Sequence, residues 1–575
     1  MTTEAGSTER RWRLLWLMLT VLLAAAAMRF YALGRESLWC DEAYTAFTIR
    51  LPLGEMITQL VHTDDAPPLF YLLQKLSTAL AGDSESGLRI GPAVMGFLAV
   101  VILLGRALHR GSGACGWSAA FLAVATYGVF HARQARSYVL LILLGLVFIL
   151  CAKDMLFGKR RAGPLLAVGG ILLWMTHHVA VVLVLTSLFL WPLGGARRPR
   201  LRSWILWHAA PLVTWVVYWI AASSQLAAHA ELNVWTTQYW QTHHLGFGPL
   251  YSLGVFLPGG LPSSEVGVGF ATPRDISSQW AFFSAALGLV CFLAAIFRRR
   301  GPTFGETSDL GREIGAEVVF LLVPLLVLLT ASLVMTPVYV LTRTDAVAFP
   351  AFVLLMGRGL ASLRRNVSGG ILFFWFLISL YALAPSYGLG NEGEAKGIDR
   401  QLAQNMAAGG LAQDDWVVHT FMTAPSIEYY LERMGAAHRV AYFPKIAGRN
   451  TASAWPTPVD SLQAYMDEAA ELRLSLEETL PEDGAVWVFC VVEPSAAGAI
   501  RQGRTARTLS VDQIGYPVSA LVYNLVGTKP VKPVSLHTQD WIGGHRAVLW
   551  IPRESWVPQD TSVLGESNIE GGVRP

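Results

Sequence analysis

The chain has 575 residues, of which 15% are charged and 53% are hydrophobic, and its mean hydropathy is +0.42. Because soluble domains carry about 25% charged residues, this composition excludes a disordered or purely soluble chain. The net charge is +3, and no stripe of basic residues interleaved with aromatic residues is evident, so no nucleic-acid partner is expected. Apolar runs such as LLWLMLTVLLAAAAM have the length that a bilayer requires, which predicts a polytopic α-helical membrane protein.

The positions of Lys and Arg predict the topology, because these residues collect on the cytoplasmic side of a membrane. Arg10, Arg11 and Arg13 place the N-terminus in the cytoplasm. A retained first helix is preferred to a cleaved signal peptide because many apolar runs follow it. About eleven transmembrane helices result, over approximately residues 14–33, 88–108, 114–131, 137–156, 164–177, 178–194, 203–222, 278–297, 318–335, 346–362 and 369–385.

The odd number of spans leaves the last third of the chain outside the cell membrane. There the β-rich runs WVVHT, HRVAYF, AVWVFCVV and RAVLWI alternate with helix-like segments, which favours a soluble α/β fold. We therefore expect a transmembrane domain over residues 1–386, with a first outer loop over 34–87, and an extracytoplasmic soluble α/β domain over 387–575. The protein is expected in the cell membrane, which would be the inner membrane of a bacterium.

The first outer loop carries acidic residues close to the lipid boundary. Asp41 and Glu42 lie in LWCDEAYTAF, and His62, Asp64 and Asp65 lie in HTDDAPPLFY. Adjacent residues do not share one helical face, so at most one of Asp41 and Glu42 is expected to point into a cleft. A solvated loop with Asp41 near a helix N-cap is the alternative interpretation, and it stays open here.

Candidate cations fall at the same predicted outer face. They are Arg133 and Arg136 in FHARQARSY, His177 and His178 in WMTHHVAV, and Arg343 in VLTRTDAVAFP. A guanidinium presents a planar fork of donors that matches phosphate oxygens, so converging arginines would hold a phosphate leaving group. For the first two arginines, snorkelling at the interface is the open alternative, and for the histidines it is a buried hydrogen-bonded role.

A carboxylate beside phosphate-binding cations suits glycosyl transfer from a polyprenyl-phosphate sugar. The carboxylate would act as general base on an acceptor hydroxyl, while the cations stabilise charge on the departing phosphate. No HExxH or paired CxxC motif occurs, so the sequence does not predict a zinc site.

The first 385 residues resemble the GT-C superfamily of glycosyltransferases, in the branch of the protein O-mannosyltransferases and the lipid A aminoarabinose transferase. The resemblance rests on the acidic pair after the first helix, on an acidic residue before PPLFY, on ARSY, and on an arginine before a helix that contains FPAF. It implies that Asp41 is the catalytic base, that Glu42 and Asp65 support the acceptor or donor, and that Arg136 and Arg343 contact the donor phosphate. Arg133 and His62 are further candidates for the phosphate, and Asp64, Tyr71, Tyr138, His177 and His178 for support. The family includes members with and without a divalent cation, and the sequence leaves that cofactor open.

Two departures from the family pattern concern the donor. Relatives often have Lys directly before the two prolines, where this chain has Ala66. Many relatives follow the late arginine with Tyr, whereas here Arg343 is followed by Thr344 and Asp345, a carboxylate that would pair with the arginine.

The sequence thus predicts an inverting transferase with a polyprenyl-phosphate sugar as donor, a lipid, glycan or protein as acceptor, and membrane lipids as surroundings. A transporter or flippase of lipid-linked saccharides is the main alternative, although the centres of the spans are largely apolar and no inverted repeat is evident. A membrane-anchored binding or sensing protein is a third class, for which eleven spans exceed what an anchor requires.

Overall fold

The computed structural model describes residues 2–62, 66–222, 236, 240, 245–260, 277–297, 306–335, 337–389, 399–419, 424–443, 462–492, 518–531, 533–537 and 545–557. Within these residues the chain divides into two compact units. The first covers residues 1–35 and 48–390, and the second covers residues 36–47 and 391–575. The acidic segment 36–47, which the sequence placed with the membrane domain, is therefore grouped with the C-terminal part of the chain.

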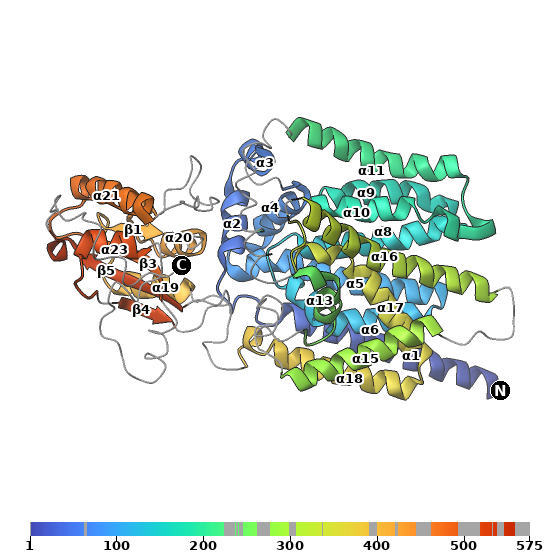
Figure 1. The fold of residues 1–575 in the computed structure, drawn as a ribbon. Coiled ribbons are helices and arrows are strands. Elements are labelled where there is room, and N and C mark those ends of the chain that lie inside the picture. Colours follow the sequence, from blue (N-terminus) through green and yellow to red (C-terminus); the bar gives the residue numbers. More distant parts are fainter. Residues whose placement is uncertain are drawn as a thin grey trace. The chain divides into compact units, whose positions relative to one another are not determined.

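The first unit is built from helices (Figure 1). Its α-helices are α1 Thr2–Phe30, α3 Leu53–His62, α4 Leu69–Ala81, α5 Glu85–Arg110, α6 Gly113–Val124, α7 Thr126–Ala132, α8 Tyr138–Leu156, α9 Gly163–Trp174, α10 Val181–Leu188, α11 Leu201–Ala222, α13 Gly248–Phe256, α15 Ser278–Phe297, α16 Glu306–Val334, α17 Phe349–Ser362 and α18 Arg365–Ala382. Short 3-10 helices are η1 Arg160–Ala162, η2 His178–Ala180, η3 Trp191–Arg197, η6 Leu245–Phe247, η7 Thr344–Val347 and η8 Pro385–Tyr387. Helix α2, Cys40–Arg50, begins in the second unit and ends in the first.

Six helices of the described residues are long and apolar enough to cross a membrane, and eight spans result if each of two bent helix pairs crosses as one. The six are α5, α8, α11, α15, α16 and α18; the bent pairs are α6 with α7 and η2–α10 with η3. Three shorter apolar helices, Leu14–Phe30, Gly163–Trp174 and Phe349–Ser362, lie on the remaining predicted spans. Apolar helices thus occur at every predicted position, while the number of crossings, about eleven, stays a prediction.

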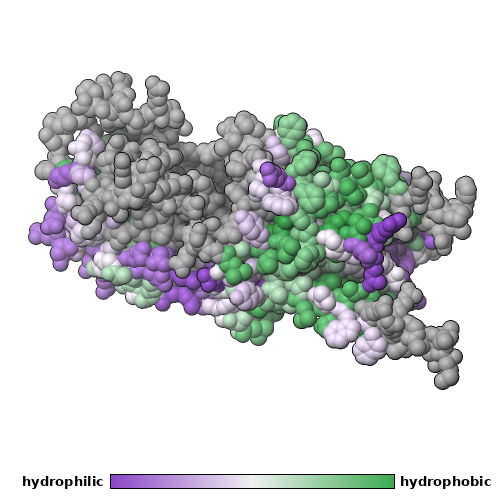
Figure 2. Space-filling model, turned by 90° about the horizontal axis from the view of Figure 1, so that it is seen from below, coloured by the Kyte–Doolittle hydropathy of each residue, from purple (hydrophilic) through white to green (hydrophobic). Residues whose placement is uncertain are grey.

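The helices differ in how much of their surface the unit encloses. In the apolar window of α8, 78% of the residues are buried, against 17% in α11. A helix that is apolar all round and enclosed is a core element, whereas an apolar helix that is exposed requires lipid around it. Large apolar side chains such as Phe282, Val334 and Phe373 are exposed on this unit. Figure 2 shows a broad hydrophobic surface on the face in view. The chain is a multi-pass membrane protein.

The second unit contains a five-stranded sheet in the order β2-β1-β3-β5-β4. Its elements are α19 Asp399–Ala408, β1 Trp416–His419, α20 Ala424–Arg433, β2 Arg439–Tyr442, α21 Leu462–Thr479, β3 Ala485–Val492, α23 Val518–Val526, β4 Pro533–His537, β5 His545–Pro552 and η12 Arg553–Ser555. β1 is parallel to β2 and β3, and β5 is antiparallel to β3 and β4. Four of these strands, β1, β2, β3 and β5, coincide with the four β-rich runs of the sequence.

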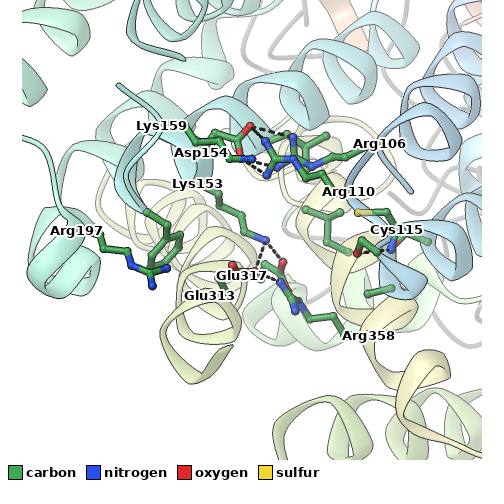
Figure 3. Close-up of a pocket in the computed structure, with 16 residues that line it drawn as sticks. Arg106, Arg110, Cys115, Lys153, Asp154, Lys159, Arg197, Glu313, Glu317 and Arg358 are labelled. Carbon is green, nitrogen blue, oxygen red and sulfur yellow. Dashed lines mark hydrogen bonds and ion pairs between the residues drawn. The ribbon is translucent and has the colours of Figure 1, made fainter. Parts of the chain in front are cut away.

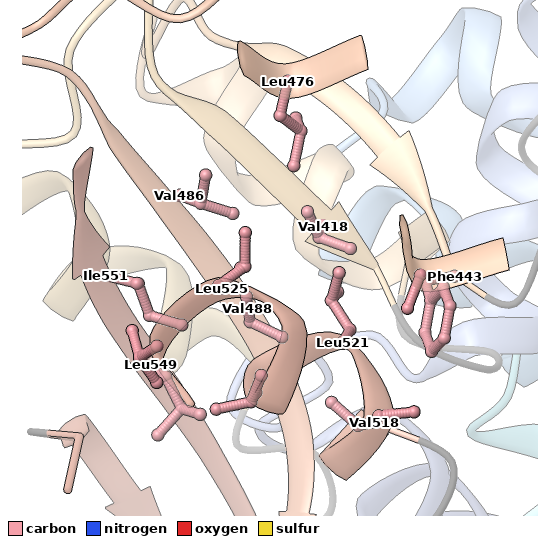
Figure 4. Packing of buried hydrophobic residues seen from close by; sticks show 14 of the residues in the cluster. Val418, Phe443, Leu476, Val486, Val488, Val518, Leu521, Leu525, Leu549 and Ile551 are labelled. Atoms are coloured by element: carbon pink, nitrogen blue, oxygen red, sulfur yellow. The ribbon is translucent and has the colours of Figure 1, made fainter. Parts of the chain in front are cut away.

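Alternation along the strands separates the two faces of this sheet. Val418, Val486 and Leu549 face a hydrophobic core formed with α21 and α23 (Figure 4). The next residue, His419, faces the opposite side and bonds to Glu428 of α20. The sheet is therefore covered by helices on both faces.

Candidate functional site

A continuous series of side-chain contacts joins three turns at one end of the first unit. The Tyr127 hydroxyl donates to Asp345 at 2.9 Å, and the Tyr127 ring lies 4.5 Å from that of His131. The His131 ring lies 5.3 Å from Tyr138, whose ring lies 5.9 Å from His177. The series connects the turn before η7, the turn before α8 and the turn between α9 and η2. Those turns carry Arg343, Arg136 and the paired histidines, so the structure brings together segments that are 40 to 200 residues apart.

The turn that presents Arg343 is tight and strained. Thr342 has φ +61°, a left-handed conformation that is costly for a β-branched residue. The Val340 carbonyl accepts from the amides of Arg343 and Thr344, and the Thr344 hydroxyl accepts from the Val340 amide at 2.8 Å. Backbone strain of this kind persists only where the surrounding structure holds the backbone in place, and it occurs often at ligand sites. Arg343 itself is half-buried.

Asp345 fixes the position of η7. It is fully buried, one carboxylate oxygen accepts from Tyr127 and the other accepts from Ser252 at 2.7 Å. Ser252 also bonds to the Tyr339 hydroxyl at 2.7 Å. Burial raises the pKa of Asp345 to about 6, although the hydrogen bonds from Ser252 and Tyr127 act in the opposite direction. The two hydroxyls thus hold the carboxylate that the sequence analysis expected beside Arg343.

The two neighbouring arginines of FHARQARSY have different surroundings. Arg133 is 4% exposed, and its guanidinium donates to the carbonyls of Tyr31 at 2.6 Å and Ser386 at 3.1 Å. It also lies 4.7 Å above the Tyr387 ring, so it joins the chain after α1 to η8. Arg136 is half-buried in the turn that precedes α8. Arg136 is therefore the better placed of the two for a ligand.

The paired histidines face different neighbours. His177 Nδ1 accepts from the Val179 amide at 3.3 Å, and its ring packs near Tyr138. The His178 ring packs near Tyr218 at 5.3 Å and near Trp219 at 6.1 Å on α11. Only His177 is part of the contact series that leads to Asp345.

The PPLFY motif enters the same region through the backbone. The Leu69 amide, at the start of α4, donates to the Met175 carbonyl at 3.1 Å, two residues before His177. Tyr71 lies in the first turn of α4 and is 5% exposed. The side chain of His62 and the whole of Asp64 and Asp65 lie outside the described residues.

The acidic pair belongs to the second unit. Asp41 and Glu42 occupy the first turn of α2, where the helix dipole stabilises a negative charge, and they are 8% and 0% exposed. Two bonds attach the segment just before them to C-terminal helices: the Leu38 amide donates to the Tyr430 hydroxyl at 2.7 Å, and Arg400 donates to the Glu36 carbonyl at 3.3 Å. In the described residues, no three His, Cys, Asp or Glu side chains are grouped as metal ligands.

Sequence reasoning missed three members of the site region. Tyr127, Ser252 and His131 lie in apolar stretches, where an isolated polar residue looks like part of a helix core. A polar residue in an apolar stretch was the available signal, because a buried hydroxyl needs a hydrogen-bond partner.

Comparisons with known proteins give matches in structure only. No family model and no curated protein matches the chain. The structure is similar to ArnT from Cupriavidus metallidurans bound to undecaprenyl phosphate, with TM-score 0.46 and 12% identity over 96% of this chain and 100% of that chain. For the apo state of that protein the TM-score is 0.44 at the same identity and coverage. ArnT is a lipid A aminoarabinose transferase, one of the enzymes named in the sequence resemblance.

An oligosaccharyltransferase of Archaeoglobus fulgidus, tethered with an acceptor peptide containing the NVT sequon, is also similar. The TM-score is 0.42 and the identity 11%, over 84% of this chain and 70% of that chain. All of these TM-scores are below 0.5.

Proposed function

We propose that the protein is a membrane glycosyltransferase that moves a sugar from a polyprenyl-phosphate donor to an acceptor hydroxyl at the outer membrane face, with inversion at the anomeric carbon. The observation that carries this proposal is the contact series from Asp345 to His177, which gathers the turns of Arg343 and Arg136 inside an apolar helical unit. Guanidinium groups at such a place suit a lipid phosphate, because the phosphate stays at the boundary while its hydrocarbon tail lies along apolar helices.

The proposed reaction is a single displacement. The acceptor oxygen attacks the anomeric carbon, the bond from that carbon to the phosphate oxygen breaks, and the acceptor proton passes to the Asp41 carboxylate. Arg343 and Arg136 stabilise the charge that develops on the departing polyprenyl phosphate. Glu42 orients Asp41 or binds the acceptor, and Tyr138, Tyr71 and His177 line the donor region. The two arginines support a donor that carries a phosphate.

The strained turn at Thr342 supports the role of Arg343. A backbone held in an unfavourable conformation places the following side chain within narrow limits, which suits a group that must meet a developing charge. A protein that uses Arg343 only as an interface anchor would not require this conformation.

The test uses the full chain in lipid nanodiscs with a panel of synthetic polyprenyl-phosphate sugars and cell-envelope extract as acceptor. Wild type is expected to release polyprenyl phosphate. Asp41→Asn and Arg343→Gln are expected to reduce release by roughly 100-fold or more, since each removes a group that acts on the transition state. Asp414→Asn and Arg364→Gln, which change exposed residues, are matched controls.

Three further readouts separate the alternatives. Release that is the same with and without EDTA would show that no divalent cation takes part, and loss with recovery on Mg²⁺ or Mn²⁺ would show that one does. Movement of labelled lipid-linked sugar across vesicles, without any release and unchanged in Asp41→Asn, would support a transporter and contradict the proposal. A product with retained anomeric configuration would contradict the single displacement.

A further inference from the structure

A cavity of about 330 Å³ lies in the first unit, where α5, α8 and α17 end and α6 begins. The Arg343 turn precedes α17, whereas the cavity lies toward the C-terminal end of that helix. This volume falls within the range of about 300–1,000 Å³ that is common for small-molecule sites. The rule for Lys and Arg assigns these helix ends to the cytoplasmic side. The proposed transferase site does not use this cavity.

Asp154 of α8 forms one side of the cavity together with two arginines of α5. Arg106 donates to both oxygens of Asp154, at 2.6 and 3.0 Å, and Arg110 also bonds to both oxygens. One carboxylate is thus shared by two guanidinium groups (Figure 3). The side chains of Arg106 and Arg110 are 17% and 27% exposed, so both remain accessible from the cavity.

The other side is formed by α16 and α17. Arg358 Nε donates to Glu317 at 2.6 Å, and its Nη2 donates to Glu313 at 2.5 Å. Lys153 bonds to the same Glu317 and lies 3.8 Å from Glu313. Lys153 stands between the two networks in Figure 3. Glu317 is 1% exposed, so these bonds form the floor of the cavity.

The positive charge of the cavity exceeds its negative charge. Among the described lining residues, six are cations and three are carboxylates. Two of the cations, Lys159 and Arg197, are exposed at the rim. The N-terminus of α6 also lines the cavity through Ser112, Ala114 and Cys115, and a helix N-terminus adds a partial positive charge. The lining thus has a surplus of three positive charges, and like charges repel one another.

We propose that this cavity binds a phosphate dianion, either as inorganic phosphate or as the monoester headgroup of a lipid. A guanidinium donates two parallel hydrogen bonds to phosphate oxygens, and Arg106, Arg110, Lys159 and Arg197 all line this one cavity. A bound dianion offsets two of the three surplus charges. The expected ligand is a phosphate group that carries two negative charges. This site is separate from the proposed donor site.

The test measures thermal unfolding of the full chain in nanodiscs. In phosphatidylcholine discs, inorganic phosphate is titrated at constant ionic strength with chloride as reference. In a second arm, without added phosphate, phosphatidic acid discs are compared with phosphatidylglycerol discs, whose diester headgroup carries a single charge. A rise in the midpoint with inorganic phosphate identifies a free anion, and a rise with phosphatidic acid alone identifies a lipid monoester.

The test variant is Lys159→Gln with Arg197→Gln, since both side chains are exposed and the buried network remains intact. We expect the apparent affinity for the responding ligand to fall roughly tenfold or more, because two charge-assisted contacts are lost. Arg364→Gln with Arg365→Gln removes the same charge from exposed positions that do not line the cavity, and it should respond like wild type. The proposal is overturned if neither ligand raises the wild-type midpoint, or if the rim variant responds as wild type does.

Discussion

Glu428 lies between two histidines on the face of the sheet covered by α20. Its carboxylate bonds to His419 Nε2 at 2.5 Å and to His438 Nε2 at 3.0 Å. Burial acts to raise the pKa of Glu428, but the bonds from His419 and His438 outweigh it and lower this pKa to about 2. Burial acts to lower the pKa of His438, and the bond to Glu428 reverses this and raises it. The stability of the second unit should therefore depend on pH through this group of three residues.

We expect the contribution of Glu428 and His438 to be largest between pH 4.5 and 6.5, the ordinary pKa values of the two groups. The lowered pKa of Glu428 means that its part is lost as the pH falls from 4.5 to about 2. The raised pKa of His438 means that its part is lost as the pH rises above 6.5 through the folded-state value. Hydrogen exchange of the β1 and β2 amides, corrected for the intrinsic effect of pH, measures this dependence.

Glu428→Gln should flatten the pH profile of amide protection, because the charge partner of both histidines is gone. Glu432→Gln changes an exposed residue one turn along the same helix and should keep the wild-type profile. Equal pH profiles in wild type and Glu428→Gln would show that the three residues do not couple to the stability of the sheet.

Asp345 should make the stability of the first unit depend on pH as well. Burial raises its pKa from 3.8 to about 6, so the folded state binds the proton more tightly than the unfolded state. The stabilisation is full below pH 3.8 and is lost as the pH rises through about 6. Each pKa unit corresponds to about 1.4 kcal/mol of unfolding free energy, so the loss is on the order of 3 kcal/mol.

The unfolding midpoint in nanodiscs should therefore fall between pH 5 and pH 7 in wild type, and this fall should be smaller in Asp345→Asn. Asp83→Asn removes an exposed carboxylate and serves as control. If the unfolding midpoint of Asp345→Asn falls as steeply as that of wild type, the buried carboxylate is not the source of the pH dependence.

At the scale of elements, the start of α2 depends on helices near the C-terminus. The Tyr430 hydroxyl accepts from the Leu38 amide, three residues before Asp41, and Arg400 donates to the Glu36 carbonyl. On the proposed function, Tyr430 is a positioning residue for the base. Tyr430→Phe keeps the ring but removes the acceptor, so the backbone before Asp41 loses one fixed point.

We expect Tyr430→Phe to lower kcat roughly tenfold and to leave the KM for the donor nearly unchanged, because the donor phosphate is assigned to the arginines of the first unit. Tyr523→Phe, a change on the partly exposed surface of α23, is the control. A rise in KM with an unchanged kcat would contradict the positioning role.

Close packing of α17 gives a prediction about stability. A Cβ at Gly359 would overlap the backbone carbonyl of Cys291 on α15, and backbone atoms do not move away cheaply. Gly359→Ala should therefore lower the free energy of unfolding by about 1–3 kcal/mol. A Cβ at Gly369 of α18 meets nothing within 4 Å, so Gly369→Ala should be neutral or stabilising. Thermal midpoints of the two variants decide this, and equal midpoints would exclude tight packing at Gly359.

Local pattern and long-range contact explain which elements were predictable. Apolar runs and β-rich runs are local, so the positions of the long apolar helices and of four strands follow from the sequence alone. Strand β4 was not predicted because it begins with Pro533, is five residues long and lies at the edge of the sheet. The grouping of residues 36–47 with the second unit depends on partners almost 400 residues away, and no local pattern carries that information.

The same distinction applies to the site. Arg343 and Arg136 were predictable as candidates from their places at helix ends. The role of Arg133 was not predictable, because its guanidinium donates to four backbone carbonyls of two segments that are distant in sequence. The ion pairs of Asp154 and Glu317 were not predictable, since they form between helices that are distant in sequence.

At the scale of the whole molecule, the predicted topology assigns opposite sides of the membrane to two exposed residues. Lys529→Cys, in the second unit, should react with a membrane-impermeant thiol reagent added to intact cells stripped of their outer layers. Arg364→Cys, after α17, should react only after permeabilisation. The wild-type chain, with five cysteines, gives the background. Labelling of Arg364→Cys in intact cells would show that the topology is the inverse of the predicted one, with the phosphate cavity on the outer side.

The attachment of residues 36–47 to the second unit also orders events at the ribosome. Leu38 leaves the ribosome 392 residues before Tyr430, its hydrogen-bond partner. At about 5–20 residues per second, the acidic segment waits on the order of 20–80 s for the surface that it joins. A chain interrupted before α19 would carry every membrane helix, but its acidic segment would lack the bonds to Arg400 and Tyr430. On the proposed function, the protein would then become competent for catalysis when its synthesis is complete, and not when its helices enter the membrane.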